Sequence, residues 1–288
     1  MKSVSIIIVN FNGIAYTRKC LESLFRFHPA DDLDVIVVDN HSHDGSVDAL
    51  KSEFPNVNVI AMTENRGFGS ANNAGAKSAK ADVLFFVNND TLFVEETVST
   101  LASHLTADEK IGIVGPKLLN DDRSFQLSFG RFPSIISEYK MKQLMNDTEA
   151  QKRTVPAGVD DVPVDWVTGA AFMIQKSLYD AVGGFDEKFF LYFEDIDLNK
   201  RVRNSERSVV YCPSVQMVHF GGRSYGEMNP AVAFQYRRSQ LHYYDTHTSH
   251  LERIILRCYL SLKYAAGVFK GKDRPLTARI YRMLWKRQ

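Results

Sequence analysis

Short apolar runs alternate with amphipathic segments through the first part of this 288-residue chain. A strand that is apolar on both of its faces must be covered on both, as in a parallel sheet between two layers of helices. The pattern therefore predicts an α/β fold with a mostly parallel sheet. The expected strands are 4–9, 34–39, 57–61, 83–87 and 111–114, and the expected helices are 17–27, 44–54, 69–79 and 94–105.

The pattern changes after residue 125. Residues 125–150 are irregular and predict a lid or acceptor loop with a short helix, whereas 166–174 is again apolar and strand-like. The further expected elements are a helix from Ser177 to the glycine pair 183–184, a helix at 194–203, and short strands at 209–211 and 215–218. Only helices are expected beyond Tyr225. We therefore predict a sheet-containing domain at 1–225 and a helical C-terminal extension at 226–288.

Composition and cysteine content limit the class of protein. The chain is 44% apolar and 24% charged, which is typical of a globular domain, and its formal net charge of +1 excludes a chain-wide basic field for nucleic acid. The three cysteines fit neither a disulfide framework nor a zinc-binding spacing, which indicates a reducing compartment. The apolar run at 4–9 is too short for a signal-peptide core or a membrane span. We expect a cytoplasmic protein.

Charge is distributed unevenly along the chain. Residues 251–288 contain ten Lys or Arg and two acidic residues, so this segment carries +8 and the rest of the chain −7. The cations recur at helical intervals with Ile, Leu, Tyr and Trp between them. Such a segment is typical of a peripheral contact with an anionic membrane surface, and no stretch of it is apolar enough to span. A helical subdomain or a homo-oligomer contact explains the same pattern, and both alternatives stay open.

Polar residues follow the predicted strands at the positions where the strands end. They are Asn10, Asn12, Asp39, Asn65, Gly67, Asn88, Asn89 and Asp90. The carboxyl ends of parallel strands meet at one edge of a sheet, and this edge is where such folds bind ligands. We therefore expect these residues to build one site.

Two of these positions suggest specific chemistry. Asp90 follows a buried strand, where an unpaired carboxylate costs desolvation energy, and oxygen ligands there suit Mg²⁺ or Mn²⁺ holding a diphosphate. Capping of the next helix explains Asp90 equally well. Asp39 has the position of an acid that binds a ribose or base edge, although the turn formers after it also explain a simple turn. The glycine loop after Asn65 lacks the third glycine of a dinucleotide fingerprint, so we reject an NAD site.

The densest group of acids lies at 194–197, directly after an aromatic run at 189–193. On a helix, Glu194 and Asp197 share a face, while Asp195 points about 100° away from Glu194. One of these acids is suited to act as a general base in a dry pocket. Acids also stabilise the first turn of a helix, but that explains one or two of them better than three. We therefore favour a catalytic role.

His219 ends the predicted strand at 215–218 and precedes a Gly-Gly-Arg sequence that is suited to an anion. It is a candidate metal or phosphate ligand, with a structural histidine as the alternative.

Seven motifs together resemble those of family 2 glycosyltransferases, and most of all their bacterial rhamnosyltransferase-type branch. In chain order the motifs start at Ser5, Val37, Asn65, Asn88, Gly183, Phe193 and Val218. The resemblance extends over about residues 3–225, and seven ordered motifs are far more specific than any one of them. It implies a GT-A fold, a nucleotide-diphospho-sugar donor, a divalent cation and inversion at the anomeric carbon.

The resemblance also implies roles for individual residues. Asp90 matches the last acid of a metal-binding D-x-D-type motif whose first position is Asn88 here, so one charged ligand stands where the motif has two. Asp195 matches the acid proposed as catalytic base, with Glu194 as the second choice. His219 matches a histidine that can face the metal or the diphosphate. The other implied nucleotide-sugar contacts are Asn10, Asn12, Asp39, Asn65, Gly67, Asn88 and Asn89.

We therefore predict an inverting, metal-assisted hexosyltransferase that extends a bacterial surface glycan such as O-antigen, capsule or cell-wall polysaccharide. dTDP-rhamnose is the leading donor. A lipid-linked acceptor is expected. Residues 251–288 would then contact the cytoplasmic face of the inner membrane, where such an acceptor lies. Trp166, Thr168 and Gly169 are the expected acceptor or sugar contacts, and the aromatic run at 189–193 is a second expected stacking surface. Core packing explains both groups equally well.

Three alternatives stay open. A UDP-sugar donor carrying galactofuranose, glucose or galactose fits the same motifs. A nucleotidyltransferase would need a glycine-rich loop with Lys or Arg after the first strand, and residues 10–13 lack those cations. A non-catalytic sugar-binding module would be favoured by loss of Asp90 or Asp195, and both are present.

Overall fold

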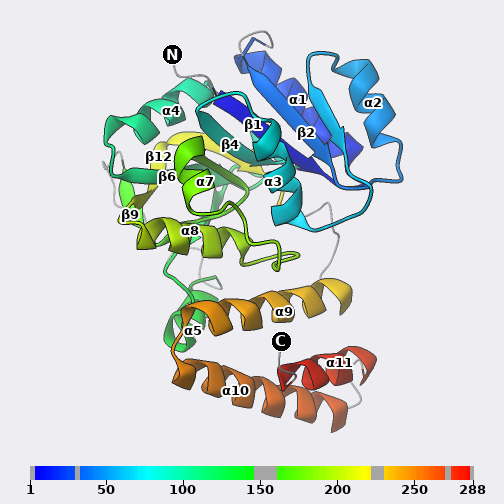
Figure 1. Cartoon of the computed structure of the whole chain (residues 1–288), viewed down its shortest axis with the longest axis vertical. Coiled ribbons are helices and arrows are strands. Elements are labelled where there is room, and N and C mark those ends of the chain that lie inside the picture. The colour runs from blue at the N-terminus through cyan, green and yellow to red at the C-terminus, as the bar shows by residue number, and fades with distance from the viewer. Residues whose placement is uncertain (1–3, 30–32, 146–160, 222–229, 270–273, 286–288) are drawn as a thin grey trace.

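The computed structural model describes residues 4–29, 33–145, 161–221, 230–269 and 274–285 (Figure 1). The elements of the first half are β1 (Val4–Asn10), α1 (Ile14–Phe27), β2 (Asp34–Asp39), α2 (Ser46–Glu53), β3 (Asn58–Ala61), α3 (Phe68–Ser78), β4 (Val83–Asn88), β5 (Thr91–Phe93), α4 (Val98–Ala107) and β6 (Ile111–Leu119). Those of the second half are β7 (Phe125–Gln126), β8 (Phe129–Gly130), α5 (Ile135–Met145), β9 (Val162–Val164), β10 (Trp166–Val167), β11 (Ala171–Gln175), α7 (Lys176–Ala181), α8 (Glu194–Asn204), β12 (Ser208–His219), α9 (Pro230–His247), α10 (His250–Phe269) and α11 (Arg274–Leu284).

The central sheet of the described residues has ten strands. Eight of them follow the order β3-β2-β1-β4-β11-β6-β12-β5, and β7 and β9 pair at its side. The pairs β1 with β2, β1 with β4, β2 with β3 and β6 with β12 are parallel, which confirms the predicted α/β class. β11 is inserted antiparallel between β4 and β6, and β5 pairs antiparallel with β12 at one edge.

Each face of the sheet has its own apolar core. Ile6 and Ile8 of β1 face the core that includes α1 and α4, whereas Ile7 between them faces the core that includes α3, α7 and α8. All three side chains are fully buried. The strands are apolar on both faces because helices cover both faces (Figure 1).

Several predicted boundaries were wrong in detail. The helix expected from residue 94 begins at Val98 with Thr97 as its N-cap, because Thr91 starts the edge strand β5. Helix capping therefore does not explain Asp90. The two strands expected at 209–211 and 215–218 are one strand, β12, with an irregular register between Cys212 and Gln216. The segment expected to be irregular with a short helix does contain a helix, α5, but it also contains the strands β7 and β8, and its end at 146–150 lies outside the described residues.

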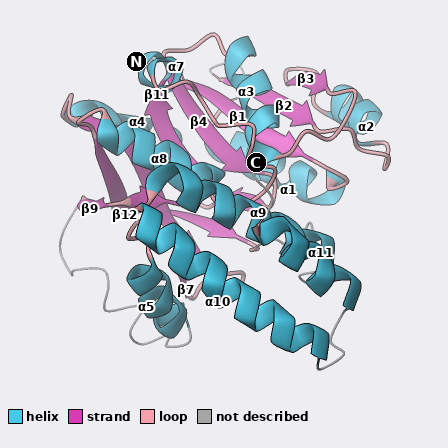
Figure 2. Cartoon of the chain, turned by 60° about the horizontal axis from the view of Figure 1, so that its bottom comes forward, coloured by secondary structure: helices cyan, strands magenta, loops and turns pink. Residues whose placement is uncertain are grey.

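The C-terminal helices form a third core with the sheet-containing part of the chain. α9, α10 and α11 contact one another and lie side by side (Figure 2). Their buried residues pack with Phe189 and Phe193, which come from the segment before α8. Beyond Tyr225 the described residues are helical, as predicted. The predicted domain boundary falls within 222–229, outside the described residues, and stays a prediction. Among the described helices, none combines the length and the apolarity that crossing a membrane requires.

Candidate active site

A pocket of about 450 Å³ lies at the carboxyl end of β4. It brings together side chains that are far apart in the sequence. Its lining includes the predicted residues Asn88, Asn89, Asp90, Trp166, Thr168, Gly169, Glu194, Asp195 and His219, together with Phe68, Tyr192 and Tyr236. The predicted metal, acceptor and catalytic residues therefore share one cavity.

Asp90 and His219 form one corner of the pocket. The Asp90 side chain is 4% exposed, and its Oδ1 lies 3.3 Å from Nε2 of His219. Nδ2 of Asn88 lies 3.4 Å from the same nitrogen. The Oδ1 atom of Asn88 is buried and has no hydrogen-bond partner among the described residues. A carboxylate, an imidazole nitrogen and the amide side chain of Asn88 thus meet in this corner.

Gln126 fixes the orientation of the His219 ring. The Nε2 group of Gln126 donates to the backbone oxygen of His219 and to Asn120 Oδ1, so its Oε1 accepts from Nδ1 of His219 at 2.7 Å. A histidine that donates from Nδ1 presents a lone pair at Nε2, which is the form that binds metals. No sequence pattern connects Gln126 with His219, because only the pairing of β6 with β7 brings this side chain beside the end of β12.

This corner fits a divalent cation. Two acceptors, Nε2 of His219 and Oδ1 of Asp90, face each other at 3.3 Å, an arrangement that positive charge stabilises. The separation is close to the roughly 3 Å edge of an octahedral site with bonds of about 2.0–2.1 Å. Oδ1 of Asn88 becomes a third ligand atom only if the amide turns over, because Nδ2 now faces His219, and Asp90 is the one acid in this set.

Asp195 is a further acid in the lining. Its Oδ2 accepts a 2.7 Å hydrogen bond from the backbone N–H of Gly169, and its Oδ1 accepts from the N–H of Ile196 at 2.8 Å. A Cβ at position 169 would lie only 3.2 Å from Cβ of Asp195, so glycine permits this close approach. Burial raises the pKa of Asp195, and the backbone donors lower it in part. The acid is fixed in place and has an increased proton affinity.

The two neighbouring acids have different environments. Glu194 lines the pocket with its Oε2 buried and without a partner in the described residues, and burial together with the charge of Asp195 holds its pKa well above the ordinary value. Asp197 is buried outside this pocket between Arg201 and His247, at 2.6 Å from each. The predicted cluster is therefore divided: Glu194 and Asp195 reach the pocket, and Asp197 is part of an ion-pair network.

The predicted residues Asn10, Asn12 and Asp39 do not line this pocket, although Val9 and Phe11 beside them do. Asn10 and Asp39 are buried, and Nδ2 of Asn10 donates to Oδ2 of Asp39 at 2.7 Å. Asp39 Oδ1 accepts from the backbone of Ser42, and Asn12 Oδ1 accepts from the backbone of His43. Asn89 connects the two regions, since its Nδ2 lies 3.3 Å from Oδ1 of Asn10. These contacts order the loop beside the pocket.

The loop at Asn65 and Gly67 lies against the segment that precedes α8. Gly67 has a φ of +89°, and a Cβ there would lie 2.4 Å from the backbone oxygen of Phe190. The N–H of Phe68 donates to that same oxygen at 3.0 Å. This close backbone contact explains the glycine and places Phe68 in the lining of the pocket.

The aromatic run at 189–193 is divided between core and pocket. Phe189 is buried in the third core, and Tyr192 is 37% exposed and lines the pocket, whereas Phe193 belongs to both the third core and the lining. Tyr192 and Phe193 both have a φ of 69°, a conformation that costs of order 1–3 kcal/mol for a residue other than glycine. The pocket also contains Tyr236 of α9, which sequence reasoning missed because α9 lies outside all of the motifs.

The family model described as glycosyl transferase family 2 matches residues 5–183, more than half of the chain. The chain belongs to this family. Glu194, Asp195 and His219 lie beyond the matched residues, so their roles stay predictions.

Curated relatives of this glycosyltransferase include rhamnosyltransferases. It is 27% identical to the N-acetylglucosaminyl-diphospho-decaprenol L-rhamnosyltransferase of Mycobacterium tuberculosis over 75% of this chain and 76% of the relative. It is 24% identical to the rhamnosyltransferase WbbL of Escherichia coli over 75% of this chain and 83% of the relative. The predicted family, its rhamnosyltransferase-like branch and an enzyme that transfers sugar from a nucleotide sugar are confirmed.

Solved structures confirm the GT-A fold. The mannosyltransferase PcManGT of Pyrobaculum calidifontis, in complex with GDP-Man and Mn²⁺, aligns with a TM-score of 0.57 and 16% identity over 100% of this chain and 88% of its own. GalNAc-T7 with UDP, GalNAc and Mn²⁺ aligns with a TM-score of 0.61 and 14% identity over 84% of this chain and 48% of its own.

Proposed function

We propose that this glycosyltransferase moves L-rhamnose from dTDP-rhamnose to a hydroxyl group of a lipid-linked bacterial surface glycan, with inversion at the anomeric carbon. The observation that carries this proposal is the placement of Asp195 and the Asp90–His219 corner in one pocket of suitable size. The names of the curated relatives support rhamnose and a diphospho-lipid acceptor.

Asp195 acts as the general base in this proposal. The acceptor hydroxyl gives its proton to the carboxylate while its oxygen forms a bond to the anomeric carbon on the face opposite the diphosphate. The bond from that carbon to the diphosphate breaks, and the diphosphate takes the electron pair. A single displacement of this kind inverts the configuration. Gly169 and Ile196 orient the carboxylate, since their N–H groups each donate to one of its two oxygens. Glu194 is the second candidate for the base.

Asp90, Asn88 and His219 would hold a divalent cation, Mg²⁺ or Mn²⁺. When bound, the cation supplies positive charge that stabilises the leaving diphosphate. The Mn²⁺ in the two similar solved structures supports a divalent ion, and the converging ligand atoms of this chain support its place.

The donor and acceptor lie on different sides of the pocket in this proposal. The nucleoside lies along the strand ends at Asn10, Asn12, Asp39, Asn65, Gly67 and Asn89. The acceptor sugar lies near Trp166, Thr168 and Gly169, because these residues and Asp195 share the same part of the lining.

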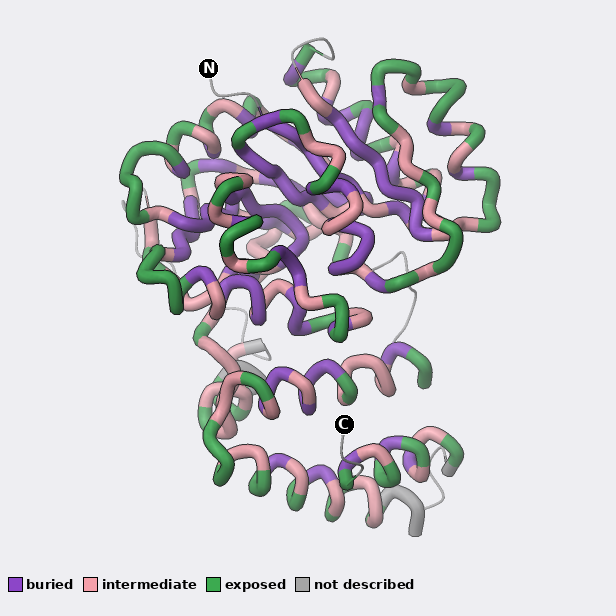
Figure 3. The backbone as a smooth tube through the Cα atoms, viewed as in Figure 1, coloured by how far each residue is buried: buried purple, intermediate pink, exposed green. Residues whose placement is uncertain are grey.

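The outer face of α10 supports a peripheral contact with the cytoplasmic face of an anionic membrane. Leu251, Ile255, Tyr259 and Leu262 recur at helical spacing and are exposed, whereas Leu256 and Leu260 are buried. Buried and exposed positions alternate along α10 (Figure 3). The +8 charge of residues 251–288 complements anionic lipid. Contact with a second copy of the chain is the alternative occupant of this face.

A ligand-binding screen tests the donor. Thermal unfolding is followed with dTDP, UDP, GDP and their sugar conjugates, each with and without Mg²⁺ or Mn²⁺. A ligand at 100 times its Kd stabilises the folded state by about 2.7 kcal/mol. We expect cation-dependent stabilisation by dTDP-rhamnose. Stabilisation by UDP-galactofuranose, UDP-glucose or UDP-galactose instead would overturn the donor, and stabilisation without a cation would overturn the metal.

A further inference from the structure

Tyr236 brings the C-terminal extension into the active site. It lies on α9 and lines the same pocket as Glu194 and Asp195. Its ring centroid is 5.6 Å from that of Tyr192 at an interplanar angle of 65°, and 5.4 Å from that of Phe193 at 62°. Phe193 is buried and its ring contacts that of Tyr236, so Tyr192 and Tyr236 form an aromatic corner that Phe193 supports.

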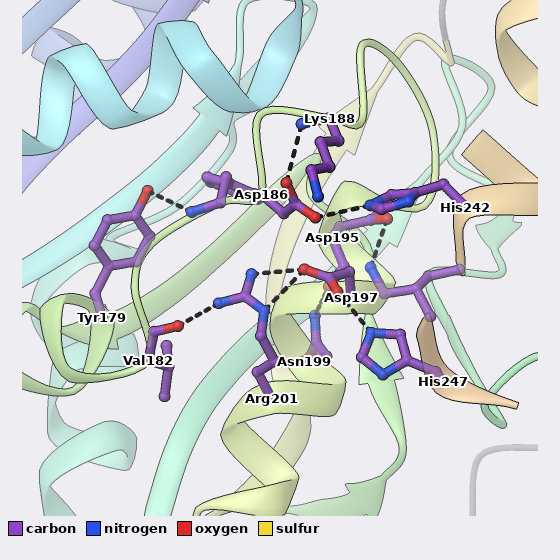
Figure 4. Close-up of polar contacts among 12 residues, drawn as sticks. Tyr179, Val182, Asp186, Lys188, Asp195, Asp197, Asn199, Arg201, His242 and His247 are labelled. Carbon is purple, nitrogen blue, oxygen red and sulfur yellow. Dashed lines mark hydrogen bonds and ion pairs between the residues drawn. The ribbon is translucent and has the colours of Figure 1, made fainter. Parts of the chain in front are cut away.

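Polar contacts fasten α9 to the helix that carries Asp195. Nε2 of His247 lies 2.6 Å from Oδ1 of Asp197, and Nε2 of His242 lies 2.8 Å from Oδ2 of Asp186 (Figure 4). These two contacts tie α9 to α8 and to the turn that precedes it.

A third contact lies closer to the pocket. The Oγ of Ser239, one helical turn after Tyr236, donates to the backbone oxygen of Leu191 at 2.8 Å. Leu191 directly precedes Tyr192, so this bond joins the two elements that carry the aromatic rings. Tyr236 is therefore held in a fixed position relative to the acids, as a binding site requires.

The backbone at Tyr192 points to a role in binding. Two consecutive aromatic residues, Tyr192 and Phe193, adopt the left-handed conformation that favours glycine. Both rings line the pocket, but Phe193 is buried in the third core whereas Tyr192 stays exposed. Backbone strain of this kind occurs where a functional side chain must be placed against local preference.

We infer that Tyr192 and Tyr236 form a stacking subsite for the sugar ring of the acceptor; this rests on the proposed function. The flat rings offer apolar surface to the C–H face of a pyranose, and the neighbouring acids offer acceptors to its hydroxyl groups. The subsite belongs to the acceptor and not to the donor because it adjoins Asp195, which must reach the attacking hydroxyl, while the diphosphate lies at Asp90 and His219.

Four variants test this subsite. Tyr236→Leu removes the ring but keeps apolar contact with Phe193, and Tyr236→Phe keeps the ring. Tyr192→Ala removes the exposed ring that contacts Tyr236. This variant still tests the subsite if a change at Tyr236 prevents folding. Tyr139→Ala removes an exposed tyrosine of α5 that does not line the pocket and serves as the control.

The assay uses dTDP-rhamnose and an N-acetylglucosaminyl diphosphate with a short alkyl chain. It measures the acceptor KM, the donor Kd and the hydrolysis of donor without acceptor. We expect Tyr192→Ala and Tyr236→Leu each to raise the acceptor KM by about three- to tenfold, the range for one aromatic contact. In these two variants the donor Kd and the rate of donor hydrolysis should stay within twofold of the wild-type values. Tyr236→Phe and Tyr139→Ala should have the acceptor KM of the wild type.

Other outcomes separate the two proposals. An unchanged acceptor KM in Tyr192→Ala and Tyr236→Leu, with an active wild type, overturns the subsite alone. A rise in donor Kd as large as the rise in acceptor KM would assign the two rings to the donor, and this would also overturn the acceptor subsite. A wild type that neither binds nor hydrolyses dTDP-rhamnose overturns the proposed donor, and the subsite inference falls with it.

Discussion

The backbone N–H of Gly169 donates a 2.7 Å hydrogen bond to Oδ2 of Asp195, and this bond joins the turn before β11 to the first turn of α8. The two segments are 26 residues apart in the chain. The contact gives the acid a fixed direction within the pocket, because the second carboxylate oxygen is held by the N–H of Ile196.

Asp195→Asn tests the general base. The amide cannot take a proton from the acceptor hydroxyl, so we expect transfer to fall by about 10²–10⁴-fold while the donor Kd stays within a few-fold. Asp180→Asn, at an exposed acid of α7, is the matched control and should keep full activity. A loss of donor affinity as large as the loss of rate would assign Asp195 to the donor site.

Glu194→Gln tests the buried acid through the pH dependence of stability. Burial raises the pKa of Glu194, so the folded protein keeps a proton that the unfolded chain releases near its ordinary pKa of about 4.3. The folded state therefore loses stability relative to the unfolded state as the pH rises through this window. Glutamine cannot ionise. The Tm of the variant minus the Tm of the wild type should therefore increase from pH 4 to pH 8.

Melting curves at several pH values check this prediction, with Glu64→Gln at an exposed position as the control. A Tm difference that is the same at every pH would contradict it.

Gln126→Leu tests the support of His219. Loss of the Oε1 acceptor frees the ring to turn, and removal of such outer partners typically lowers metal affinity by about 10–100-fold. Calorimetric titration of Mn²⁺ in the presence of dTDP measures this. Equal Mn²⁺ affinity in wild type and variant would place the cation away from His219.

Replacement of Leu251 and Leu262 by serine tests the membrane contact. Both side chains are exposed on α10, so the double variant should keep the fold and be released from anionic vesicles. Deletion of residues 251–288 is a poorer test, because it removes Leu256, Leu260 and Leu284 from the third core. Unchanged vesicle binding, with loss of a dimer in the variant, would assign this face to a second copy of the chain.

Local patterns in the sequence were enough to predict the sheet and most of its helices. Strand β1 is an example: Ile6, Ile7 and Ile8 are consecutive apolar residues, and this signals a strand covered on both faces without any knowledge of the partners. The polar residues at strand ends, including Asp90, were predictable for the same reason, because chain direction alone places them at one edge of a sheet.

Tertiary structure decided which of these residues work together. Asp195 and Asp197 are two positions apart on α8, yet one reaches the pocket and the other is buried by Arg201 and His247. Tyr236 reaches the pocket because α9 packs on α8. Sequence periodicity records how a segment is buried, since burial depends on the spacing of its own residues. It does not record which distant segment covers each face, because that depends on the packing of the whole chain.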